Sequence, residues 1–112
     1  MATWKMVEEL GTQLPETEVG LWYGKPALKV AGKGLIHLGG RAKVGTLSIP
    51  TPEKDDLIAE RPEVFFDTDH LRGSPWVLVE LSKISKAELR EMLADAWRMR
   101  APAKLRKAHP EI

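Results

Sequence analysis

The first half of the chain alternates between apolar and polar positions with the two-residue period of a β-strand. Four segments predict strands: residues 17–23, 27–31, 35–38 and 44–49. Short glycine-containing turns separate them, at Gly24-Lys25-Pro26, Gly32-Lys33-Gly34 and residues 39–43. Alternation places Trp22, Lys29 and His37 on one face, whereas Tyr23 is expected on the other with its apolar neighbours. The pattern predicts an antiparallel meander.

Helical periodicity marks both ends of the chain and one segment in its middle. Residues 2–13 predict a first helix, and a short second helix is expected to begin with Thr51 as N-cap and Pro52 at its first position. Ser85 and Glu88 form a capping box for a third helix over residues 85–100. Its predicted buried stripe is Leu89, Met92, Leu93, Ala96 and Trp97.

Residues 64–68 and 76–81 predict two further strands between the second and third helices. The order is therefore helix, four strands, helix, two strands, helix. Alternation leaves one sheet face apolar and the other mixed. We expect an α+β, two-layer fold in which helices cover one face of an antiparallel sheet of five to six strands and leave the other face at least partly open.

A length of 112 residues indicates a single domain, which we assign to residues 1–105, followed by a basic tail over 106–112. The chain contains no cysteine, so disulfides and thiolate chemistry are excluded. No apolar run reaches the ~20 residues that span a bilayer. The N-terminus lacks the pattern of a signal peptide, so we expect a cytoplasmic protein without membrane contact.

Charge is segregated along the chain although the net charge is only +1. Residues 25–49 carry basic side chains and no acidic ones: Lys25, Lys29, Lys33, Arg41 and Lys43. Because alternate turns of a meander lie at the same end of the sheet, Lys25 is expected near Arg41 and Lys43, with Lys33 at the opposite end. Such segregation favours a basic face, but it is also compatible with neighbouring elements that pair their charges.

The turn from His70 to Trp76 combines a histidine, an arginine, a glycine, a proline and a tryptophan before an apolar strand. In a structural interpretation, Gly73 supplies a positive φ, Arg72 pairs with Asp67 or Asp69, and the turn aims Trp76 outward. In a functional interpretation, His70, Arg72 and Trp76 form a corner that binds an anion or ligand.

Five motifs of this chain resemble the MmcQ/YjbR family. They are Lys25-Pro26, the hairpin from Leu28 to Lys33, Pro62-Glu63-Val64-Phe65-Phe66, His70-x-Arg72-Gly73-x-Pro75-Trp76-Val77, and the ending Asp95-Ala96-Trp97-Arg98 with Ala101-Pro102. They follow in the family's order over roughly residues 4–105. The resemblance implies a CyaY-like fold and a DNA-binding protein with a double-wing motif.

We therefore expect a non-enzymatic domain that binds nucleic acid through basic hairpin tips and the open sheet face. The residues assigned to this site are Lys25, Lys29, Lys33, Arg41, Lys43, Arg72 and Trp76. The alternative is a protein-interaction or chaperone-like module, or self-association, through the tryptophan-bearing face. No cofactor or metal is expected, because a cluster of acids around Glu53 is more typical of a solvated helix, and His70 with Asp67 or Asp69 is the sole acid–base candidate.

Overall fold

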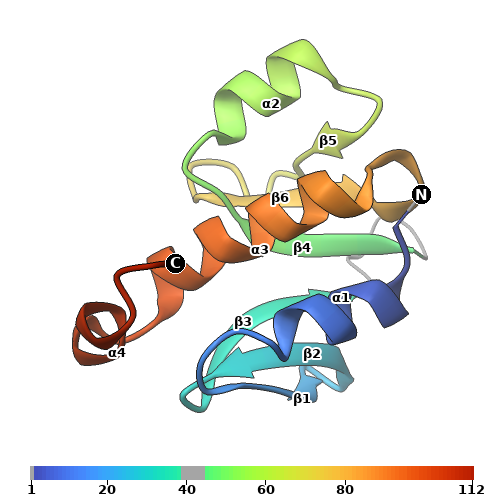
Figure 1. Ribbon diagram of the computed structural model, residues 1–112. Helices are drawn as coiled ribbons and strands as arrows, with labels where there is room; N and C mark the ends of the chain where they lie inside the picture. Colours follow the sequence, from blue (N-terminus) through green and yellow to red (C-terminus); the bar gives the residue numbers. More distant parts are fainter. Residues whose placement is uncertain (1, 39–44) are drawn as a thin grey trace.

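The computed structural model describes residues 2–38 and 45–112 (Figure 1). The elements in chain order are α1 (Trp4–Gly11), β1 (Thr17–Trp22), β2 (Lys25–Val30), β3 (Lys33–Leu38), β4 (Thr46–Pro50), α2 (Lys54–Glu60), β5 (Phe65–Phe66), β6 (Trp76–Glu80), the 3-10 turn η1 (Leu81–Lys83), α3 (Lys86–Arg100) and α4 (Ala103–Ala108).

The six strands form one antiparallel sheet in the order β1-β2-β3-β4-β6-β5. Helices α1 and α3 lie side by side on one face of it (Figure 1). The predicted fold class is thereby confirmed. Strand β6 lies next to the edge, since only the two-residue β5 pairs with its outer side.

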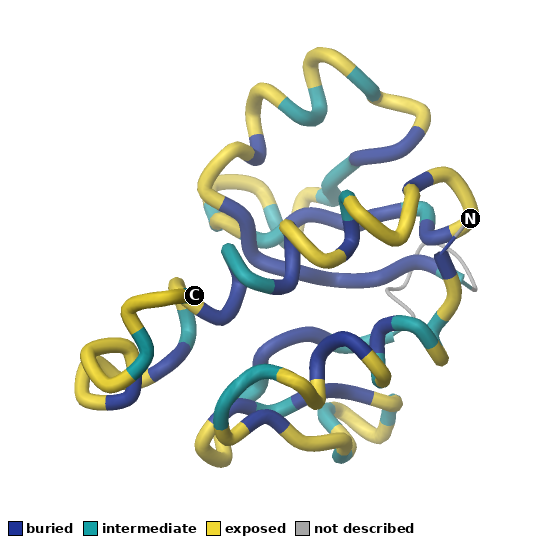
Figure 2. Tube along the Cα trace, viewed as in Figure 1, coloured by how far each residue is buried: buried dark blue, intermediate teal, exposed yellow. Residues whose placement is uncertain are grey.

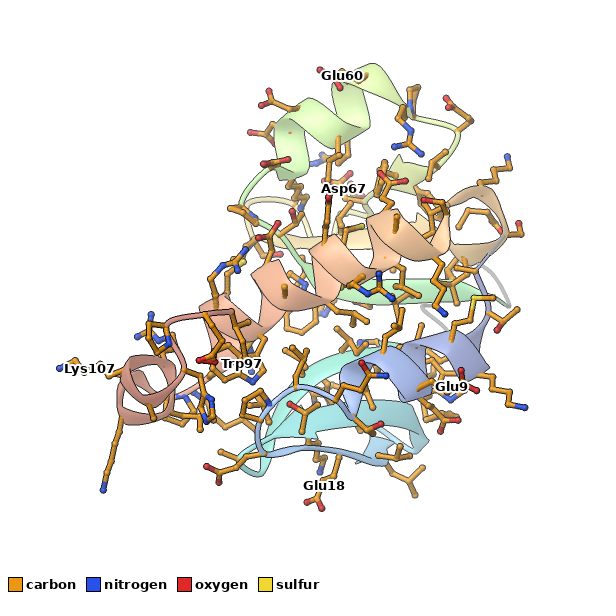
Figure 3. The ribbon with its side chains drawn as sticks, viewed as in Figure 1. Glu9, Glu18, Glu60, Asp67, Trp97 and Lys107 are labelled. Carbon is orange, nitrogen blue, oxygen red and sulfur yellow. The ribbon has the colours of Figure 1, made fainter. Side chains whose placement is uncertain are left out.

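The hydrophobic core lies between the sheet and the two long helices, where buried backbone segments concentrate (Figure 2). The predicted stripe of α3 is buried in it as expected. The largest buried side chain, Trp97, is 1% exposed, and its indole Nε1 donates a hydrogen bond to the carbonyl of Pro15 at 3.0 Å. Trp97 thereby holds α3 against the segment between α1 and β1 (Figure 3).

The first two hairpins turn one residue earlier than predicted. Trp22 pairs with Lys25 across the turn residues Tyr23 and Gly24, both of which have positive φ. The second turn likewise uses Ala31 and Gly32 at positive φ. Two successive positive φ values match the twist of the flanking strands, so the lysines that follow each turn begin the next strand.

The expected start of the second helix was wrong by two residues. Helix α2 begins at Lys54, and Thr51 instead accepts a hydrogen bond from the backbone N–H of Glu53 in the preceding turn. Half of the predicted capping box forms at α3: Ser85 Oγ accepts from the Glu88 N–H, while the Glu88 carboxylate binds Arg61.

Helix α4 spans the expected boundary between the domain and a basic tail. The predicted boundary at residue 105 falls inside this helix, and Leu105 is buried in the core. Lys107 extends away from the molecule (Figure 3).

Candidate functional site

The open face of the sheet is the one opposite α1 and α3, and four aromatic or heteroaromatic side chains meet on it. We call Trp22, Tyr23, His37 and Trp76 the open-face cluster. His37 pairs with Ser48 of β4, and Trp76 pairs with Pro50 two residues further along the same strand. Residues two apart in a strand project to one face, so His37 and Trp76 lie together.

The rings of the open-face cluster contact one another although they come from the first hairpin, β3 and β6. The Trp22 ring centroid lies 5.4 Å from that of Trp76 and 5.2 Å from that of His37, both in edge-on geometry. Tyr23 stacks on Trp22 with centroids 5.6 Å apart and planes inclined by 16°. These separations lie within the range that stabilises aromatic pairs.

Tyr23 was expected on the opposite face from Trp22, and this prediction was wrong. Its positive φ of 56° ends the strand and turns the chain, so strand alternation no longer applies to it. The ring stacks on Trp22 and remains 81% exposed.

The Trp22 ring packs directly against Gly34. A Cβ atom at Gly34 would lie 2.6 Å from Cε3 and Cζ3 of Trp22, closer than any side chain tolerates. The indole therefore lies directly against the backbone of β3. Only glycine permits this approach, and it explains how a side chain from the edge strand reaches Trp76.

Arg100 joins the cluster from the helical layer at the end of the sheet. It is the last residue of α3, and its Nε donates to the carbonyl of Gly34 at 3.0 Å. Its guanidinium carbon lies 5.5 Å from the ring centroid of Trp76, which is a cation–π distance. Arg100 was not predicted from the sequence, because no local pattern indicates that the end of a helix on one face reaches a ring on the other.

Two of the assigned basic residues, Lys25 and Lys29, flank the cluster, and Lys33 lies at the other end of the sheet. Lys25 follows the first turn next to Trp22, whereas Lys33 is exposed after the second turn and pairs with the core residue Val30, so it projects to the helical face. Lys29 pairs across the sheet with Glu18, and its aliphatic stem lies along Gly20. The other two residues of the basic segment, Arg41 and Lys43, lie outside the described residues.

Arg72 lies apart from the cluster in an acidic environment. It pairs with Asp69 at 2.9 Å, as the structural interpretation predicted, and Gly73 has the expected positive φ of 84°. Arg72 also lines a cavity of about 610 Å³ whose other charged groups include Asp55, Asp56 and Asp67.

Lys54 is the buried cation beside that cavity, and its ammonium group has a structural role. Its Nζ donates to the carbonyls of Leu71 and Ser74 at 2.8 and 3.0 Å and lies 3.4 Å from Asp67. It thus fixes the turn that precedes Trp76. Asp67 is thus engaged by Lys54, and Asp69 by Arg72.

His37 lies at the centre of the open-face cluster, and its pKa is lowered. Burial lowers its pKa below the ordinary value, with the nearby charge of Lys25 acting in the same direction and the backbone of Leu38 opposing it. Its Nδ1 is buried and has no hydrogen-bond partner among the described residues. The neutral imidazole is therefore the favoured form at neutral pH.

The described residues contain no group of three or more side chains suited to hold a metal ion. Within residues 2–38 and 45–112, no helix combines the length and apolarity needed to cross a membrane.

Comparisons with known proteins give the family of the chain and no activity. The family model described as YjbR matches residues 12–99. An uncharacterised protein of Mycobacterium bovis is 34% identical over 123 aligned positions, covering 96% of this chain and 95% of the relative. An uncharacterised protein of Mycobacterium tuberculosis matches with the same identity and coverage.

Proposed function

We propose a nucleic-acid-binding function for this chain, which belongs to the YjbR family, as the match over residues 12–99 shows. In this proposal the domain binds without catalysing a reaction, and it uses the open sheet face with the hairpins beside it. The observation that carries the proposal is the open-face cluster with cations around it.

The chemistry of the cluster suits unpaired bases. Aromatic side chains offer flat surfaces on which bases stack irrespective of sequence. The exposed ring of Tyr23 and the partly exposed rings of Trp22 and Trp76 supply such surfaces on one continuous face. Stacking of this kind contributes about 1–3 kcal/mol per base.

The cations around the cluster suit a phosphate backbone. Lys25 and Lys29 lie beside the rings, and Lys33 stands at the far end of β2–β3. Lysine neutralises phosphate as a mobile point charge and releases bound counterions, so affinity conferred in this way falls with salt. A hairpin tip bearing lysine also has the dimensions of a β-ribbon that enters a groove.

Fluorescence anisotropy with single- and double-stranded oligonucleotides over a salt series tests the proposal. The wild type is expected to bind at low salt and to lose affinity as salt rises. The Lys25→Glu variant, at the lysine that pairs with Trp22, is expected to weaken binding and to lower the slope of log affinity against log salt by about 1. The matched control is Lys86→Glu, an exposed lysine at the start of α3 on the helical face.

Two outcomes count against the proposal. One is an absence of binding to either oligonucleotide at low salt. The other is equal weakening by the Lys25 and Lys86 variants, which would mean that net charge rather than the open face attracts the nucleic acid.

A further inference from the structure

Strand β1 is an edge strand of the described sheet and lies at its lower margin (Figure 1). Two of its apolar side chains are exposed, Val19 at 50% and Leu21 at 65%, and the adjoining turn residue Tyr23 is 81% exposed. Val19 and Leu21 point to the helical face, because Val19 pairs with the buried Leu28. Exposed edge strands with apolar side chains are surfaces on which another strand can pair.

The backbone groups available on this edge follow from the first hairpin. In a two-residue turn the flanking residues, Trp22 and Lys25, are hydrogen-bonded to each other. Bonding then alternates along β1, so Gly20 and Glu18 also bond inward. The Glu16 carbonyl agrees with this alternation, since it accepts from the N–H of Ala31 at 2.8 Å.

The outward-pointing groups therefore belong to Val19 and Leu21. No hydrogen bond from the described parts of the chain outside the sheet reaches their backbones. The next residue in this outward series, Thr17, is already engaged, because its N–H donates to the carbonyl of Leu14 at 3.3 Å. On this edge, the backbone groups of Val19 and Leu21 are therefore the ones available to pair with another strand, and Gly20 lies between them.

We propose that β1 is a self-association edge, where it pairs antiparallel with β1 of a second copy about a two-fold axis at Gly20. In this register Val19 faces Leu21 of the second copy, and Leu21 faces its Val19. Each of these pairs exchanges two backbone hydrogen bonds, so every outward group of both residues is used. The four exposed apolar side chains come together on the helical face.

The residue at the axis suits this register. Gly20 forms a non-hydrogen-bonded pair with its own copy, the closest approach in an antiparallel ladder, with Cα atoms about 4.5 Å apart. A register centred on Val19 instead places Leu21 opposite Thr17, whose N–H is occupied. A register centred on Leu21 requires Tyr23 to pair, although its φ of 56° takes it out of the strand.

Charge complementarity also favours a second copy in this register. Glu18 is the one charged residue in the sequence of β1. The Gly20-centred pairing keeps the two Glu18 side chains about 14 Å apart along the strands, beyond the screening length in physiological salt. Each Glu18 then pairs with Trp22 of the second copy. In the row of paired residues that crosses the strands, it lies between Lys29 of its own chain and Lys25 of the second copy. Figure 3 shows Glu18 projecting from this edge.

Sedimentation velocity over a concentration series tests the association directly. The wild type is expected to rise from the monomer mass of 12.5 kDa toward twice that value, with a dissociation constant in the micromolar range. Val19→Glu and Leu21→Lys are each expected to weaken the dimer by at least about tenfold. The double variant places opposite charges in each Val19–Leu21 pair, so it is expected to recover dimerisation. Met99→Lys, another exposed apolar position, is the matched control.

A cysteine at the axis provides a second measurement that does not depend on affinity. The chain has no cysteine, so a disulfide in a single-cysteine variant joins two copies. The Cα separation predicted at Gly20 suits a disulfide, and a Cβ there meets only the Lys29 stem at 3.6 Å. Gly20→Cys is expected to cross-link under mild oxidation much faster than the exposed control Ser82→Cys.

Three results overturn this inference. They are a monomer at every concentration, equal cross-linking of the two cysteine variants, and a dimer that Trp76→Ala abolishes but the Val19 and Leu21 variants leave intact. The last result would place self-association on the open-face cluster.

Discussion

Replacing Gly34 with alanine tests whether the Trp22 ring truly rests on the backbone of β3. The added Cβ would lie 2.6 Å from two ring atoms, whereas carbon atoms in contact prefer roughly 3.5–4.0 Å. The indole must therefore retreat by about 1 Å, and its neighbours Trp76 and His37 restrict that movement. Overpacking of this size costs about 1–3 kcal/mol of unfolding free energy.

The matched control is Gly20→Ala, which makes the same chemical change on the same face. Its Cβ meets the Lys29 stem at 3.6 Å, an ordinary contact, and its φ does not lie in the left-handed region. The entropy that alanine removes from the unfolded chain is common to both variants and cancels in the comparison.

Urea denaturation gives the two unfolding free energies, and near-ultraviolet circular dichroism reports the packing of the rings. We expect Gly34→Ala to be less stable than Gly20→Ala by at least about 1 kcal/mol and to change the aromatic signal. Equal stabilities with an unchanged aromatic spectrum would refute the close approach of Trp22 to β3 and, with it, the geometry of the open-face cluster.

Three further predictions concern residues that hold the site in place or respond to pH. Lys54→Met is expected to cost about 1–3 kcal/mol and to speed amide exchange in the turn before Trp76, because the carbonyls of Leu71 and Ser74 lose the ammonium group that links them and Asp67 loses its cation; unchanged exchange would contradict this role. Trp97→Phe is expected to cost a similar ~1–3 kcal/mol in urea denaturation, through the lost hydrogen bond to Pro15 and the lost ring volume, and a neutral result would exclude the bond as a contributor. Because the pKa of folded His37 lies below its ordinary value of 6.5, the unfolded chain binds a proton first as pH falls, so stability is full above about pH 6.5 and declines below it. Thermal denaturation of His37→Phe from pH 7.5 to 5 should show a smaller decline than the wild type, and parallel curves would argue against a buried neutral imidazole.

The fold could be predicted from the sequence because the patterns that indicate it are local. Strand alternation, the Ser85 cap and the apolar stripe through Trp97 each depend on spacing within a few residues, and each appears in the structure. Element ends were less predictable, since the turns at Tyr23 and Ala31 place non-glycine residues at positive φ, which sequence patterns rarely indicate.

The candidate site was accessible only in part because its contacts join distant segments. Alternation brought Trp22, Lys29, His37 and Trp76 to one face correctly. The contact between Trp22 and Gly34 and the position of Arg100 over Trp76 depend on how strands and helix pack in three dimensions. Arg72 pairs with Asp69 and lines an acidic cavity. The proposed site therefore centres on the cluster and the lysines beside it rather than on Arg72.

The most direct test of nucleic-acid binding by the open face is the affinity of the wild type and of Trp76→Ala for one single-stranded oligonucleotide, measured by anisotropy at several salt concentrations. Removal of the Trp76 ring is predicted to weaken binding by about 1–3 kcal/mol at every salt concentration while leaving the salt slope unchanged, because stacking is lost and phosphate contacts remain. A Trp76→Ala protein that is folded and binds as tightly as the wild type, or a wild type that does not bind at low salt, would contradict the account.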